Sequence, residues 1–60
     1  MNFPKDPIML LSVTNTYLRD HYQSLADLCK SNHISESELT ERLAAISYHY
    51  DSKQNQFIQD

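Results

Sequence analysis

The sequence contains no glycine, no tryptophan and a single cysteine among its 60 residues. One thiol, that of Cys29, cannot form an internal disulfide, so we expect a reducing, cytoplasmic setting. Without glycine, another residue must adopt the left-handed conformation that closes a helix. Asn32 is the strongest candidate for the helix that we expect to precede it.

Long apolar runs and positive charge are also scarce. The longest apolar run, "IMLL" from Ile8, is far shorter than the roughly 20 residues that span a bilayer, and the opening "MNFPKDP" does not resemble a signal peptide. Eight acidic residues against five basic ones give a net charge of −3, which draws the chain neither to DNA nor to anionic lipid. We therefore expect one small globular domain, residues 1–60, with no membrane contact.

Helix-start signals occur three times along the chain. Asp6 is a suitable cap for a helix whose first residue is Pro7. Ser24 precedes a second apolar stripe, and Ser35 with Glu38 has the spacing of a capping box. The helices are expected over residues of about 7–21, 25–32 and 36–46.

The remaining residues change from helical to strand-like periodicity. Tyr48 and Tyr50 alternate with a polar residue, "DSKQN" supplies turn residues, and Asn55 can adopt a positive φ angle. These features predict a hairpin over about 48–58. The expected fold is mainly α: three short helices in a helix-turn-helix-like arrangement, followed by a small C-terminal β-hairpin, as in a winged helix.

The first predicted helix has two apolar sides when its residues are placed 100° apart. One side carries Ile8, Leu11, Asn15, Leu18 and Tyr22, and the opposite side carries Met9, Leu10, Val13 and Tyr17, with Thr14 in a narrow polar strip between them. Such a helix is normally buried on both sides. Either the hairpin covers the second side in a monomer, or a second copy covers it. We predict a homodimer with an interface formed by Met9, Leu10, Val13, Tyr17, Tyr48, Tyr50 and Phe57.

DNA binding is the main alternative because of the helix-turn-helix outline. A recognition helix needs basic or amide side chains, and its domain needs a positive surface. The third predicted helix carries Glu36, Glu38 and Glu41 against Arg42. These acids disfavour DNA as a partner, and a DNA-associated regulator with a winged helix-turn-helix remains the second hypothesis.

The sequence carries no recognisable catalytic or metal-binding motif. Cys29 and His33 are four residues apart, but neither Cys-x-x-Cys nor His-Glu-x-x-His is present. Cys29 lies on an apolar stripe with Leu25 and Leu28, which predicts a buried, unreactive thiol. We therefore expect no catalytic residue, no cofactor and no metal, and a non-enzymatic protein–protein interaction module that self-associates.

Three stretches, "PKDPIMLLSVTNTYLRDHY", "SLADLC" and "LAAISYHYDSKQNQF", resemble a bacterial family described only as domain of unknown function 4250. The resemblance covers nearly the whole chain and implies a small bacterial protein to which no catalytic or binding residues can be transferred. In that family a glycine often stands where this chain has Ser47. The resemblance also singles out a possible polar surface, formed by Lys5, Asp6, Asn15, Arg19 and Asp20.

Two positions in this polar set leave alternatives open. Asn15 is either a buried amide that fixes the register of packing or a half-solvated residue at the edge of the apolar stripe. Lys5 with Asp6 and Arg19 with Asp20 lie at opposite ends of the first helix, some 20 Å apart at 1.5 Å per residue. The two charged ends could meet only across an antiparallel dimer.

Overall fold

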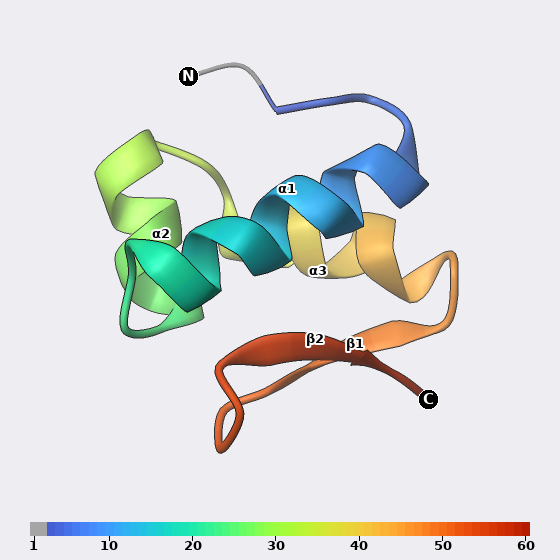
Figure 1. The fold of residues 1–60 in the computed structure, drawn as a ribbon. Helices are drawn as coiled ribbons and strands as arrows, with labels where there is room; N and C mark the ends of the chain where they lie inside the picture. Colours follow the sequence, from blue (N-terminus) through green and yellow to red (C-terminus); the bar gives the residue numbers. More distant parts are fainter. Residues whose placement is uncertain (1–2) are drawn as a thin grey trace.

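The computed structural model describes residues 3–60, and its element order confirms the predicted three helices followed by a hairpin (Figure 1). The elements are α1 (Pro7–Asp20), α2 (Leu25–Asn32), α3 (Glu36–Ala44), β1 (Tyr48–Asp51) and β2 (Gln56–Gln59). Helix α1 contacts α2, α3 and strand β2, while β1 lies against α3. The hairpin therefore forms a second layer beneath the helices.

Each helix begins directly after the residue predicted to cap it. The side chains of Asp6, Ser24 and Ser35 accept hydrogen bonds from the backbone N–H groups of Ile8, Asp27 and Glu38, at 2.9, 3.0 and 3.3 Å. These bonds satisfy donors that have no partner within the helix. The carboxylate of Glu38, which a full capping box would return to Ser35, instead binds Arg42 one turn further on, at 3.3 Å.

The helix ends differ from prediction. Helix α1 ends at Asp20 and helix α3 at Ala44, one and two residues before the expected ends at about 21 and 46. Asn32 was expected in the left-handed conformation, but that expectation was wrong: Asn32 is the last residue of α2, and His33 adopts φ 56°. The reason is that the Asn32 amide already has partners. It donates to the Leu28 carbonyl of the same helix at 2.9 Å and to the Tyr22 hydroxyl, before the helix, at 3.2 Å. Ser47 at φ 65° and Asn55 at φ 53° form two further left-handed corners, the latter as predicted.

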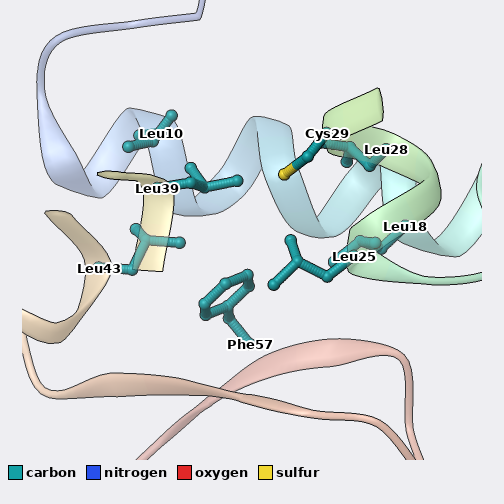
Figure 2. Close-up of a cluster of buried hydrophobic side chains, with 8 residues drawn as sticks. All are labelled: Leu10, Leu18, Leu25, Leu28, Cys29, Leu39, Leu43 and Phe57. Atoms are coloured by element: carbon teal, nitrogen blue, oxygen red, sulfur yellow. The ribbon is translucent and has the colours of Figure 1, made fainter. Parts of the chain in front are cut away.

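A single hydrophobic core joins all three helices and β2 (Figure 2). Its members are each at most 5% exposed, and they are Leu10, Leu18, Leu25, Leu28, Cys29, Leu39, Leu43 and Phe57. Phe57 is the core residue that the hairpin contributes. The burial of Cys29 confirms the predicted buried thiol, and loss of hydration there raises the pKa of that thiol.

Helix α1 has one broad buried face, so the prediction of two opposite apolar sides was wrong. Leu10, Thr14 and Leu18, spaced four residues apart, form the centre of that face. Thr14, which was expected in a polar strip, is fully buried, and its hydroxyl has no partner among the described residues. The two predicted stripes lie on either side of this centre, and only Ile8 and Met9 remain exposed among the large apolar residues of the helix.

The side chain of Asn15 joins α1 to the hairpin. Its Nδ2 atom donates to the Phe57 carbonyl at 3.0 Å, and its Oδ1 atom accepts from the Phe57 N–H at 2.7 Å. Gln56 returns a bond from its Nε2 atom to the Asn15 carbonyl at 2.9 Å. Asn15 thus combines the two alternatives: it is half-buried, as the second had it, but its amide fixes the position of β2 against the helix, as the first had it.

A second amide, that of Asn55, ties the hairpin turn to the end of α1. Its Nδ2 atom donates to the carbonyls of Leu18 and Tyr22, both at 2.9 Å. Its Oδ1 atom accepts from the Tyr50 hydroxyl at 2.6 Å, and that hydroxyl accepts from the Leu25 N–H at 3.2 Å. The turn is thereby attached to both α1 and the start of α2.

Replacing Asn15 by alanine should lower the free energy of unfolding by about 2–4 kcal/mol, because both backbone groups of Phe57 would lose their partner. Urea denaturation measures this loss. Ser12→Ala, at an exposed position of the same helix, is the control and should change stability by less than about 0.5 kcal/mol. Equal stability of the two variants would contradict the proposed role of Asn15.

The isosteric variant Asn15→Asp adds a pH dependence to this prediction. Its carboxylate would face the Phe57 carbonyl, so that the folded state favours the protonated form and raises the pKa of the new carboxyl group. Stability is then gained as the pH falls through the raised pKa of the folded state, so the deficit relative to wild type should shrink as the pH falls towards about 4, the ordinary pKa of the group, and should level off below it. A deficit that stays constant with pH would contradict this arrangement.

Thr14→Val should raise the free energy of unfolding by about 1 kcal/mol, because it removes a buried hydroxyl that has no partner among the described residues and preserves the side-chain shape. Thr16→Val is the matched control, since the Thr16 hydroxyl is exposed and donates to the Ser12 carbonyl at 2.9 Å. The control should gain no stability in the same thermal or urea titration. A loss of stability in Thr14→Val would show that the hydroxyl has a stabilising contact.

Candidate functional site

The first turn of α1 carries an exposed apolar pair. Ile8 is 62% exposed and Met9 is 57% exposed, and they are the exposed large hydrophobic residues of the described chain. Asp6 and Pro7 fix where the helix begins. Leu10, the residue that follows the two exposed ones, already lies in the core. The two side chains therefore lie on the outer side of a turn whose inner side is buried, and we call them the Ile8–Met9 pair.

An open groove of about 490 Å³ lies beside this turn, between the N-terminal segment and α3. Apolar side chains form much of its lining, and charged residues stand among them. The lining residues are Phe3, Lys5, Leu10, Ile34, Glu38, Leu39 and Arg42. A smaller hollow of about 310 Å³ is lined by Lys5, Pro7, Arg42 and Ala45. Since Lys5 and Arg42 line both, the two hollows adjoin.

The charged residues of the groove are mainly positive, in a chain whose net charge is −3. Arg42 forms an ion pair with Glu38 at 3.3 Å, and both side chains are exposed, so water screens the pair. Lys5 takes part in no ion pair among the described residues. The groove thus combines an apolar lining with two cations, of which Lys5 has no ion-pair partner within residues 3–60.

The residues of the predicted interface do not form one surface. Leu10 and Phe57 are 1% and 2% exposed, so they belong to the core and are not available to a partner. Met9, Val13 and Tyr17 follow one another along α1, on the side of the helix away from Asn15 and the hairpin. Tyr48 and Tyr50 are half-buried on β1, where the Tyr50 ring packs on Phe57 at 5.6 Å.

An aromatic cluster at the middle and end of α1 holds the N-terminal segment in place. The Tyr17 ring makes edge-to-face contacts with Phe3 at 6.0 Å and with Tyr22 at 6.3 Å between ring centroids. Such contacts add to the burial of the rings themselves. Because Phe3 also lines the groove, this cluster positions one wall of it.

The predicted polar surface is divided among three roles. Lys5 and Asp6 lie at the candidate site, the first in the groove and the second at the helix cap. Asn15 binds the hairpin. Arg19 and Asp20 bind each other through two bonds of 2.8 Å, and the hydrogen bond from Arg19 lowers the pKa of the Asp20 carboxyl. The meeting of the two charged ends across a dimer remains a prediction.

Residues 3–60 hold neither a metal-binding cluster nor a membrane-spanning helix. No group of three or more histidine, cysteine, aspartate or glutamate side chains that could hold a metal occurs among them. Within the same residues, no helix is both long enough and apolar enough to cross a bilayer.

The groove and Ile8 were missed when the sequence was considered alone. The groove lining comes from the N-terminal segment, α1, the α2–α3 turn and α3, so no local pattern marks it. The sequence placed Ile8 with Leu11 and Leu18 on a buried side of the helix. The buried face is instead centred on Thr14, and Ile8 lies outside it. The capping signals around Asp6 predicted where the helix begins, but they did not indicate that its first turn carries exposed apolar side chains.

Comparison with known proteins gives one result. No curated protein and no solved structure matches the chain. A family model described as "Domain of unknown function (DUF4250)" matches residues 4–57, which include every helix and most of the hairpin. The chain therefore belongs to this family, a domain of unknown function.

Proposed function

We propose that this protein is a non-enzymatic protein–protein interaction module that self-associates through the start of α1. The observation that carries the proposal is the exposure of the Ile8–Met9 pair, 62% and 57%, whereas the other large apolar side chains of residues 3–60 are wholly or partly buried. Exposed apolar side chains beside charged residues are typical of interaction sites. Lys5, Asp6 and Arg42 supply those charges.

The expected strength of association follows from the size of the pair. Covering the exposed part of an isoleucine or methionine contributes about 1–2 kcal/mol, and a symmetric dimer would cover four such side chains. Lost translational and rotational freedom opposes this gain. Because the gain of about 4–8 kcal/mol is reduced by this cost, the proposal implies a weak dimer, with a dissociation constant well above one micromolar and near the millimolar range.

The non-enzymatic part of the proposal rests on the chemistry of the site. The titratable side chains at the groove are Lys5, Glu38 and Arg42, which lie at the surface. The chain's single thiol is in the core, where burial raises its pKa and so keeps it protonated. A groove with these groups has no activated nucleophile, whereas its apolar lining suits a side chain from another protein.

The hypothesis of a DNA-associated regulator gains no support from α3. In a helix-turn-helix this helix would enter the major groove. Glu36, Glu38 and Glu41 are exposed on it, and Arg42 is paired with one of them. Carboxylates at that position would repel the phosphates.

Self-association should depend on concentration in light scattering coupled to size exclusion. Wild type should change from 7.0 kDa towards twice that mass as its concentration approaches the millimolar range. The double variant Ile8→Ser, Met9→Ser should remain at the monomer mass, since its outer turn is polar. Ala26→Ser, an exposed change on α2, is the control and should behave as wild type. A wild type that stays at the monomer mass throughout would overturn the proposal.

A DNA titration separates the two hypotheses directly. At low salt, where phosphate contacts are strongest, the protein should show no detectable retention on a mixed-sequence duplex. Tight, salt-dependent retention that is lost on replacing Lys53 and Arg42 would instead favour the regulator.

A further inference from the structure

We infer that the Ile8–Met9 pair of one chain occupies the groove of a second copy, and that the second copy's pair occupies the groove of the first. The inference rests on the proposed self-association and names the surface that receives the pair. Each chain would supply both halves of the contact, as a two-fold dimer requires. Three observations support this arrangement.

The first observation is the position of the pair and the groove on one turn of α1. Leu10 contributes to the groove, whereas Ile8 and Met9, two residues and one residue earlier, point outward. Pro7 lines the adjoining hollow. An outward pair and an open groove that are adjacent but point in different directions can be exchanged by a two-fold axis passing near the start of the helix.

The second observation is the area that a dimer needs. Even a small specific interface buries about 600 Å² on each partner, which is about one seventh of the 4087 Å² surface of this chain. Two side chains packed against their own symmetry mates cover much less than this. Seating the pair in a groove of about 490 Å³ adds the groove walls to the contact, and the two-fold axis doubles that addition.

The third observation is the charge beside each half. Asp6 stands just before the pair, and its carboxylate is exposed at the N-terminus of α1. Lys5 and Arg42 stand at the groove, and Arg42 is held only by an exposed pair with Glu38 at 3.3 Å. When the Ile8–Met9 pair enters the groove of the second copy, Asp6 brings a negative charge next to a groove that has two cations and one anion. This local match opposes the repulsion between two chains of net charge −3.

Cross-linking between two different single-site variants tests the arrangement. Met9→Cys places a thiol on the pair, and Glu38→Cys places one at the groove, where it leaves Arg42 free for the partner's Asp6. Mixed in equal amounts at a concentration where wild type is dimeric, and oxidised gently, the two variants should give the mixed disulfide well above the half expected from random pairing. Mass spectrometry of the unreduced protein separates the three products.

Two controls accompany this experiment. Wild type should give no disulfide dimer, since Cys29 is buried. Met9→Cys mixed with Ala26→Cys should give no excess of the mixed product, because Ala26 lies on α2, away from the groove.

The possible results separate this inference from the proposal on which it rests. If wild type is dimeric but Met9→Cys links chiefly to itself, the pair packs on its symmetry mate and the groove assignment is overturned, while self-association stands. If wild type never dimerises, both fail. An excess of the mixed product supports both.

A charge variant provides an independent measurement. Asp6→Asn keeps a good helix cap but removes the negative charge beside the pair. The dimer dissociation constant should rise roughly two- to tenfold, and the difference from wild type should vanish at high salt. An unchanged constant at low salt, with the fold intact by circular dichroism, would overturn the charge match between pair and groove.

Discussion

The position of the hairpin depends on the hydrogen bonds between the Asn15 amide and the backbone of Phe57. A two-stranded sheet is marginal by itself, and here the outer edge of β2 receives from a helix the bonds that a third strand would supply. With that edge fixed, the Phe57 ring lies in the core against leucines from α1, α2 and α3. The amide thereby determines which hairpin residue completes the core.

The candidate site depends on a different part of the same helix. The pair is exposed because the helix begins at Pro7, which leaves only one turn before the buried face is established. Phe3 reaches back along α1 to Tyr17, so the N-terminal segment forms one wall of the groove. Among the described residues, those that line the groove include none from the hairpin, so the Asn15–Phe57 contact and the candidate site lie on different sides of α1.

The order of the elements and the start of each helix could be predicted because they depend on local signals. The caps at Asp6, Ser24 and Ser35 each bind as the sequence suggested, and the left-handed Asn55 falls in the predicted turn. The burial of α1 could not be predicted from periodicity. Thr14 has a polar side chain, so its position was taken as a polar strip between two apolar sides. It is instead buried at the centre of one wide face.

The long-range contacts were accessible only in part. Asn15 could be singled out as an amide on an apolar stripe, but its partner lies 42 residues away in sequence, and nothing local identifies it. The groove is harder still, since four separate segments line it. What the sequence did indicate correctly is the burial of the Cys29 thiol.

The left-handed corners at His33, Ser47 and Asn55 have a consequence for how this chain can vary. Asparagine and histidine tolerate that backbone region better than most residues, and serine has no side-chain branch at Cβ to obstruct it. Valine, isoleucine or proline at these corners would force the backbone out of its path. Evolutionary substitution at the three bends should therefore be confined to glycine, histidine and small or amide-bearing residues.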